Sequence, residues 1–377
     1  MRIELRFFVA VLLGSATISF GFPAVAREVR YKDYPLELKD IERISLIGLH
    51  GSVKITPSAA GRQPVMHVRK VVADKASAED VARFEAMSFE VRKEGRTLVI
   101  EERVAEHSSD LKSETPMSGV VSATANSKVP SREASKELAD VWFKAGSPEL
   151  IFEVEAPSVP VEVSVRNGQI LLNQWHQAAA LAVVNGAIHS SASEGPLRMQ
   201  IQHGEIKVEK HRGRLEIDSY NAKINLSEVD GDVSLNNFSG ESSLSSVQGA
   251  IDLKSATGPS LVSKSSGAID FITGRGNLNL AGFEGPIRGQ SDQGLVSATI
   301  EGDAEIHIES NQGAVAVKLP SDSGASVKLQ SEEGLLSAPD SLHAQAHAKS
   351  LNGRLSGDGP KGSVAIKTKT APVKVRI

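Results

Sequence analysis

Cysteine is absent from all 377 residues of the chain, and aromatic residues make up only 4% of it. The first absence excludes disulfides, thiolate metal sites, a cysteine nucleophile and a lipid-modified N-terminal cysteine. The second indicates an interior of stacked aliphatic side chains rather than large rings. A folded chain of this composition is held together by its core, without covalent cross-links.

An excess of one charge is lacking too, as are the familiar catalytic motifs. The formal net charge is −4, so nothing draws the chain toward nucleic acid or anionic lipid. The sequence contains no HExxH, nucleophile-elbow or Walker motif. We therefore expect a protein that is not an enzyme, with no catalytic, cofactor-binding or metal-binding residues and no cofactor.

Only one long apolar run occurs, near the first residue. Arg2 and Arg6 accompany a largely apolar stretch from Phe7 to Phe22, and Ala24-Val25-Ala26 matches an A-x-A cleavage site. An uncleaved membrane anchor is the alternative, but the apolar stretch is short for a membrane span. We expect residues 1–26 to be a signal peptide, with export to the periplasm or cell surface and no transmembrane segment in the mature chain.

What the sequence does contain is a glycine at almost every ninth position. Of the 15 positions reached in steps of nine from Gly168 to Gly294, 13 are glycine, against about one expected by chance. Only Gln177 and Ala222 interrupt the series. Such a period is typical of a repeat architecture in which one short unit is stacked many times.

Each repeat unit is a G-x-h-x-h segment, where h is an apolar residue. Mostly polar residues stand between the two apolar positions, and this alternation predicts a strand of about five residues with one buried face. The glycine takes a corner of about four residues, where a positive φ is often required.

Two such units per coil would give an 18-residue turn with two facing parallel sheets. The segment Gly249–Leu253 recurs 18 residues later as Gly267–Phe271. We therefore expect an all-β fold, a parallel β-solenoid (β-helix), with Leu226 beside Leu244. A three-sided coil would instead place Leu226 beside Leu253, and an antiparallel meander closed into a barrel or sandwich is the other alternative.

Composition divides the chain into a signal peptide (1–26), a small α+β N-terminal subdomain (27–102), a flexible insertion (103–148) and the solenoid domain (149–377). The insertion is rich in Ser, Thr, Lys and Glu and has no apolar period, apart from a brief helix expected near residues 133–143. Within the subdomain we expect two short strands from Ile44 to Ile55, a strand near 66–72, a helix from Ser77 to Met87, and a hairpin of 89–92 with 97–101.

Basic residues gather at the C-terminus. No acidic residue follows Asp358, whereas the last coil carries Lys361, Lys367, Lys369, Lys374 and Arg376. We expect looser repeats to continue through Gly362 and the last coil to present an open strand edge, which lysines and Pro372 protect from end-to-end stacking. A basic docking patch for a partner or an anionic glycan is the alternative.

Few residues suggest chemistry. His343 and His347 would share one face of a helix or strand, but with no third ligand nearby we interpret them as solvated. Corners such as NGAI and HGEI lack the aspartates of calcium-binding nonapeptide repeats. Paired carboxylates in one outward column could serve a glycosidase or lyase, although a charged column is the default on any solvent face. That column contains Glu216, Ser234, Asp252, Asp270 and Arg288.

Four aromatic residues stand two positions before a corner, where we expect them to pack: Trp175, Tyr220, Phe238 and Phe283. We accordingly expect no exposed aromatic ladder for stacking sugars.

Several segments carry a resemblance to a known family: the signal peptide, SLIGLHGSVKI, the hairpin FEVRKEGRTLVIEE, the segment IFEVEAPSVPVEVSVRNGQILL and the G-x-I-x-L repeats. Through them the chain resembles the putative adhesin domains of bacterial envelope proteins, a domain of unknown function related to the head domain of putative autotransporter adhesins. The resemblance covers most of residues 40–370, apart from the insertion at 103–148, and it implies no catalytic residues.

Together these features predict an exported, non-enzymatic, adhesin-like β-solenoid of the bacterial cell envelope. It would mediate surface interaction or scaffolding through an unknown protein or glycan partner, with no nucleic-acid partner. The alternatives are a carbohydrate-active β-helix enzyme of the polysaccharide lyase or hydrolase type, and a periplasmic envelope-assembly or stress factor.

Overall fold

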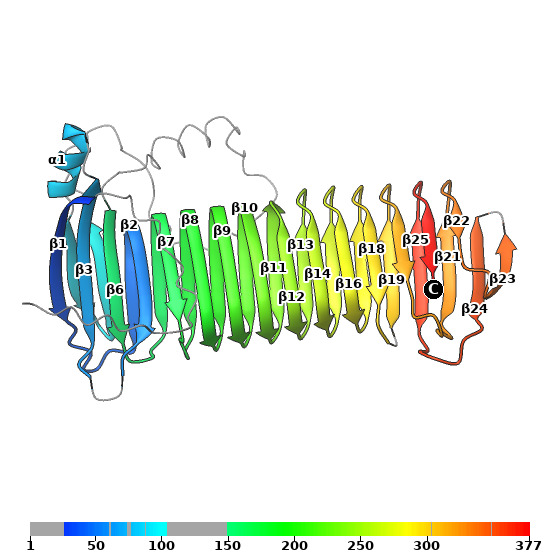
Figure 1. Ribbon diagram of the computed structural model, residues 1–377, viewed down its shortest axis with the longest axis horizontal. Helices are drawn as coiled ribbons and strands as arrows, with labels where there is room; N and C mark the ends of the chain where they lie inside the picture. Colours follow the sequence, from blue (N-terminus) through cyan, green and yellow to red (C-terminus); the bar gives the residue numbers. More distant parts are fainter. Residues whose placement is uncertain are drawn as a thin grey trace, which may run out of the picture.

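The computed structural model describes residues 26–59, 62–73, 77–86, 88–103, 149–302, 304–347 and 349–377. Most of them belong to strands, which stack into a long, narrow rod (Figure 1). The predicted signal peptide up to residue 25, nearly all of the predicted insertion and the helix expected near 133–143 lie outside the described residues.

The rod begins with one helix and six strands: β1 (Ala26–Pro35), β2 (Arg43–Pro57), β3 (Val65–Ala73), α1 (Ala78–Ala86), β4 (Ser88–Glu94), β5 (Thr97–Arg103) and β6 (Glu149–Ala156). Four long strands follow: β7 (Val161–Asn173), β8 (Ala179–Glu194), β9 (Leu197–Arg212) and β10 (Leu215–Asp230). Shorter strands continue the rod: β11 (Val233–Ser239), β12 (Ser242–Gln248), β13 (Ile251–Ser255), β14 (Ser260–Ser266), β15 (Ile269–Thr273), β16 (Leu278–Glu284), β17 (Ile287–Ser291), β18 (Val296–Ile300), β19 (Glu305–Ser310) and β20 (Val315–Lys318). The last six are β21 (Ser326–Ser331), β22 (Leu336–Ser337), β23 (Leu342–His347), β24 (Ser350–Leu355), β25 (Ser363–Thr368) and β26 (Val373–Arg376).

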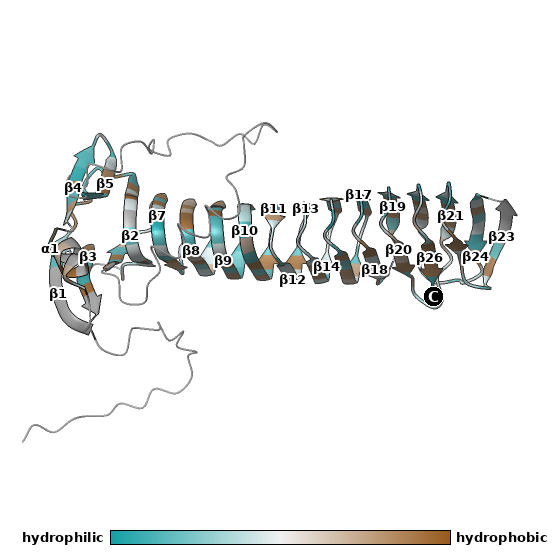
Figure 2. Ribbon diagram, turned by 90° about the horizontal axis from the view of Figure 1, so that it is seen from above, coloured by the Kyte–Doolittle hydropathy of each residue, from teal (hydrophilic) through white to brown (hydrophobic). Residues whose placement is uncertain are grey.

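Two parallel sheets face each other along the rod. The first halves of β7 to β10 continue into β11, β13, β15, β17 and β19, which we call the odd sheet. The second halves continue into β12, β14, β16, β18 and β20, the even sheet. Hydrophilic and hydrophobic residues mix along the strands (Figure 2), as expected where one strand face is buried and the other solvated.

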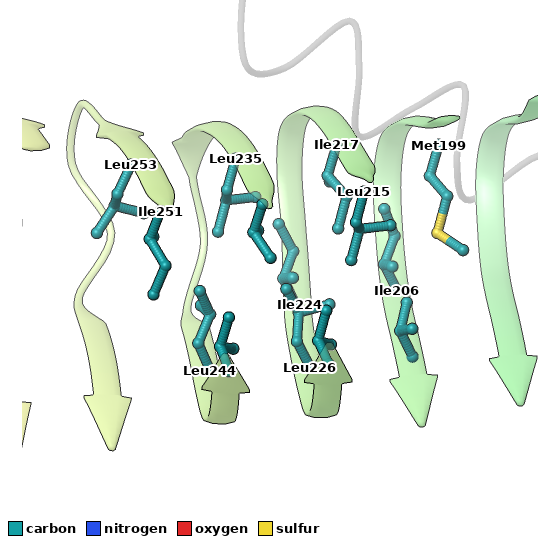
Figure 3. Close-up of a cluster of buried hydrophobic side chains, with 14 of the residues drawn as sticks. Met199, Ile206, Leu215, Ile217, Ile224, Leu226, Leu235, Leu244, Ile251 and Leu253 are labelled. Atoms are coloured by element: carbon teal, nitrogen blue, oxygen red, sulfur yellow. The ribbon is translucent and has the colours of Figure 1, made fainter. Parts of the chain in front are cut away.

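The register confirms the two-sided coil. Leu226 pairs with Leu244, Leu244 with Val262, and Val262 with Leu280, so side chains 18 residues apart stack directly. Leu235 and Leu253 pair in the same way in the odd sheet. Figure 3 shows side chains of the two ladders in the interior between the sheets. The three-sided coil and the antiparallel meander are therefore wrong.

The strands at the start of the rod are longer than predicted. Strands β8, β9 and β10 each run for 16 residues through the corner that was expected to interrupt them. Likewise the segment from Ile44 to Ile55 is one strand, β2, not two. The reason is the glycine conformation: Gly186 has a φ of +142°, which bends the chain while the ladder on either side continues.

A second regular feature occurs at the end of the even-sheet segments from β7 to β16. One residue per coil has a left-handed backbone, with φ between +49° and +63°, although only the last is glycine. These residues are Gln174, Ala192, Lys210, Glu228, Ser246, Lys264 and Gly282. A left-handed residue shifts the alternation, so that the side chain directly after it points inward.

Buried hydroxyl groups close the first corner in the later coils. The hydroxyls of Ser255, Ser291 and Thr368 donate to the carbonyl three residues ahead, at 2.9, 2.7 and 2.8 Å. Each bond satisfies a corner carbonyl that the sheet ladder cannot reach. The sequence signal is a Ser or Thr three residues before the corner.

At its beginning the rod is built out of chain order. Strand β2 lies between β7 on one side and β5 and β6 on the other, all in parallel. Strands β1, β3 and β4 then close this end with antiparallel pairs. The predicted strand near 66–72, the helix and the hairpin are confirmed as β3, α1 and the β4–β5 pair. The domain boundaries stay a prediction.

The other end is also out of chain order, and here the prediction was wrong. Strand β25 lies between β19 and β21, and β26 between β20 and β22, so the last segment of the chain is inserted within the rod. Figure 1 accordingly places the C-terminus before the end of the rod. The backbone N–H of Val315 donates to the Pro372 carbonyl at 3.1 Å. Lys367 and Lys374 thus belong to strands paired on both sides, not to an open edge.

The antiparallel strands β24 and β23 extend beyond β21 instead. Gly353 lies in β24 and so does not continue the coil repeat that was expected there. Among the residues that the structure describes, no helix is both long enough and apolar enough to cross a membrane.

Candidate functional site

The predicted outward column forms in the odd sheet. Its members pair in register from strand to strand: Glu216, Ser234, Asp252, Asp270 and Arg288. The Asp252 carboxylate forms an ion pair with Lys254 Nζ at 3.1 Å, and Asp270 is exposed. The two carboxylates therefore lie on the open surface of a sheet, where side chains are solvated.

The two predicted histidines lie on strand β23. His343 is opposite Arg354 and His347 is opposite Ser350 in the neighbouring antiparallel strand. His343 is exposed. Within the described ranges, no group of three His, Cys, Asp or Glu residues could hold a metal ion.

The four aromatic residues expected to pack at corners divide into two pairs. Trp175 and Phe283 are fully buried, as predicted. Tyr220 and Phe238 are 38% and 47% exposed, so the prediction was wrong for them. Their rings stack face to face, with centroids 5.2 Å apart and planes 4° apart. This exposed stack of two rings also contradicts the expectation that no exposed aromatic ladder exists.

Local backbone geometry explains the difference. Trp175 and Phe283 each follow a left-handed residue, Gln174 and Gly282, which turns the next side chain inward. Tyr220 follows the regular alternation of β10, in which Leu215, Ile217 and Ser219 are buried and the residue after them points outward. Counting this alternation would have found the exposed pair in the sequence.

Polar side chains surround the stacked rings. The ring of His203 meets Tyr220 edge-on, with centroids 5.8 Å apart. Burial lowers the pKa of His203, so the ring is neutral near pH 7. Asn221 and Ser239 lie beside the two aromatic residues in the next outward column, paired with one another in register. This surface can offer a flat apolar ring face together with uncharged hydrogen-bonding groups.

A shallow groove of about 600 Å³ runs along the second corner of β7 to β10. Ionisable side chains line it in two columns that run from coil to coil: His176, Glu194, Arg212 and Asp230 in one, and Lys210 and Glu228 in the other. Arg212 Nε lies 3.3 Å from Asp230 Oδ2, and His176 Nδ1 lies 3.3 Å from Glu194 Oε2. Since all four side chains are at least half exposed, these pairs contribute little to stability.

Beneath the groove lies a buried serine–histidine contact. The Ser193 hydroxyl is 2.9 Å from His211 Nδ1, and a second hydroxyl, that of Ser190, is 2.9 Å from Ser193. Burial lowers the pKa of His211. Ser193 is 3% exposed and His211 1% exposed, so a substrate cannot reach this serine without opening the coil. The contact therefore fills the core rather than forming a nucleophilic site.

The family model described as Toastrack DUF4097 matches residues 47–375. Two solved structures are similar to the chain. One is a putative cell adhesion protein from Clostridium sporogenes, with 8% identity, 93% of this chain and 99% of that chain covered, and a TM-score of 0.20. The other is a putative adhesin from Bacteroides fragilis, with 11% identity, 93% and 97% covered, and a TM-score of 0.25. No curated protein matches the chain.

Proposed function

The chain belongs to the Toastrack family, and we propose that it is an exported, non-enzymatic, adhesin-like solenoid of the bacterial cell envelope that mediates surface interaction or scaffolding. The observation that carries this proposal is the repetition of outward side chains in register from coil to coil. Such a rod presents a long surface on which side chains of successive coils stand in regular columns, which suits an extended partner. Export through residues 1–26 is part of the proposal and is supported by the signal-peptide features of the sequence.

The placement of the acidic residues supports a non-enzymatic role over a polysaccharide lyase or hydrolase. Glycosidases hold two carboxylates on either side of a bound sugar. Asp252 and Asp270 instead stand on adjacent strands of one open sheet, and Lys254 pairs with the first of them.

Binding to envelope fractions tests the proposal. Purified protein comprising residues 27–377 would be mixed with cell-wall, outer-membrane and surface-polysaccharide fractions of the bacterium that produces it, and each fraction would be sedimented. We expect one of the fractions to retain the protein saturably. The variant Leu244→Asp, which buries a charge in the interior ladder, serves as the unfolded control. Equal retention of the two proteins would contradict specific binding.

Two further measurements address export and activity. Deleting residues 2–26 should leave the protein in the cytoplasm on cell fractionation. Incubation with pectin or alginate should release no new reducing ends or unsaturated products. Products that disappear in the variants Asp252→Asn or Asp270→Asn would instead support the enzyme alternative.

A further inference from the structure

Among the described residues, the stacked pair of Tyr220 and Phe238 leaves one ring face that meets no further ring. On one side the pair ends at the edge-on ring of His203. On the other side, the positions 18 and 36 residues after Phe238 are Ala256 and Gly274, which have little or no side chain. The face of Phe238 that points along the rod therefore has no large side chain after it in its own column, and we call it the open face; Phe238 is 47% exposed.

Uncharged hydrogen-bonding groups lie alongside the open face of Phe238. Asn221, Ser239 and Thr257 occupy one position of three successive coils, one residue after the aromatic column. Asn221 and Thr257 are exposed and Ser239 is half-buried. Amides and hydroxyls both donate and accept hydrogen bonds, and none of these three carries a charge.

The combination fits a sugar ring. A pyranose presents a face of C–H bonds that meets the electron-rich face of an aromatic ring, while its hydroxyls point outward around the edge. The open face of Phe238 would take the C–H face, and Asn221 and Ser239 would bond the hydroxyls. The Thr257 hydroxyl donates to the Phe238 carbonyl at 3.3 Å, so it would accept from a sugar hydroxyl. An ionic ligand would need an opposite charge here, and this column offers none.

A protein partner fits less well. Stable protein interfaces bury about 800 Å² on each side around an apolar core. The nearby exposed apolar surface consists of two rings, and the other large exposed apolar residue on the odd sheet, Ile272, lies on a different outward column. Two rings with a polar margin match one or two sugar units better than a protein core.

We infer that the corner formed by Tyr220 and Phe238, with Asn221, Ser239 and Thr257, binds a neutral hexose or N-acetylhexosamine oligosaccharide by stacking one sugar ring on Phe238. This inference rests on the proposed function and specifies its ligand class. The repeat spacing of about 4.8 Å between coils is close to the length of one sugar unit, so an oligosaccharide lying along the rod would meet the polar column at successive units.

Calorimetric titration with cellohexaose and with N-acetylglucosamine hexamer tests the inference on residues 27–377. We expect saturable binding of at least one of the two. Phe238→Ala should weaken it at least tenfold, which corresponds to about 1.4 kcal/mol, and Tyr220→Ala should weaken it less because Tyr220 supports the ring from behind. Ile272→Ala removes an apolar side chain that is at least as exposed, on another column of the odd sheet, and should leave binding unchanged. Circular dichroism and thermal melting would verify that each variant is folded.

Two outcomes would overturn the inference: no binding of either oligosaccharide by the folded wild-type protein, or binding that Phe238→Ala leaves intact. Sedimentation with envelope fractions separates this from failure of the proposed function. If Phe238→Ala still binds its envelope fraction as the wild type does, the ligand site lies elsewhere and only the present inference is wrong. If the wild type binds neither envelope fractions nor oligosaccharides, both are wrong.

Discussion

Replacing Gly186 with alanine tests the close stacking of successive coils at the first corner. Gly186 has a φ of +142°, a conformation that residues with a side chain rarely adopt. An added Cβ would lie 2.8 Å from the carbonyl carbon of Gly168 and closer still to its oxygen. Gly204 approaches Gly186 in the same way one coil further on. The glycine column therefore allows backbones to approach where a methyl group has no room.

Two costs contribute to the expected destabilisation. The unfavourable backbone conformation costs on the order of 1–3 kcal/mol. Moving the neighbouring coil away from the new methyl group would break roughly two ladder hydrogen bonds, each worth about 1 kcal/mol net. We expect Gly186→Ala to lower the free energy of unfolding by about 3–5 kcal/mol.

Gly95→Ala is the matched control. Gly95 has a φ of +60°, and an added Cβ there would meet nothing within 4 Å. Only the backbone strain remains, about 1 kcal/mol. Urea unfolding of the wild type and both variants, followed by far-ultraviolet circular dichroism, measures the difference. If Gly186→Ala costs no more than Gly95→Ala, the argument from close stacking is refuted.

Three further substitutions test other features of the coil. Lys210 has a left-handed φ of +57°, so Lys210→Gly should raise the free energy of unfolding by about 0.5–1 kcal/mol, and an unchanged or lower melting temperature would contradict this. An added Cβ at Gly289 would meet the ring of Phe271 one coil away. Gly289→Ala should therefore lower the free energy of unfolding by about 1–3 kcal/mol in the wild type, and by less in a Phe271→Leu background. Additive losses in this double-mutant cycle would argue against the contact. The pKa of His211 is lowered by burial, so the unfolded chain binds a proton more readily and stability is lost as the pH falls below about 6.5. His211→Asn should reduce the difference in unfolding free energy between pH 8 and pH 5. A part of the difference should remain, because burial also lowers the pKa of His189 and His203. An undiminished difference would exclude His211 as a contributor.

The glycine interruptions show how closely local sequence and local geometry correspond. Ala222 replaces a glycine of the first-corner column. Unlike most glycines of that column, Ala222 does not have a positive φ. Ala222 is only 2% exposed, so this corner holds a Cβ in its interior. Gln177 replaces a glycine at the second corner, and its φ is not positive either. Each interruption therefore occurs where the corner does not require glycine.

The aromatic residues show where a spacing rule is insufficient. All four stand two residues before a corner, yet two are buried and two are exposed. The distance to the corner was the wrong variable, since a left-handed residue before Trp175 and before Phe283 reverses the direction of the next side chain. A left-handed conformation at Gln174 leaves no reliable mark in the sequence, because its cost is compensated by coil contacts.

The sequence by itself determined the 18-residue coil, its two facing sheets and the residues of the interior ladders, because strand alternation and glycine corners are set by residues a few positions apart. Only the tertiary structure decided the order in which coils stack. Strand β25 lies beside β19, although the residues that pair, such as Ile308 and Ile366, are 58 positions apart in the chain. Every coil with the same inward pattern offers its neighbour the same row of backbone N–H and C=O groups. The periodicity of the sequence therefore cannot distinguish one stacking order from another. The choice depends on the packing of complete coils and on the path of the segment that connects them.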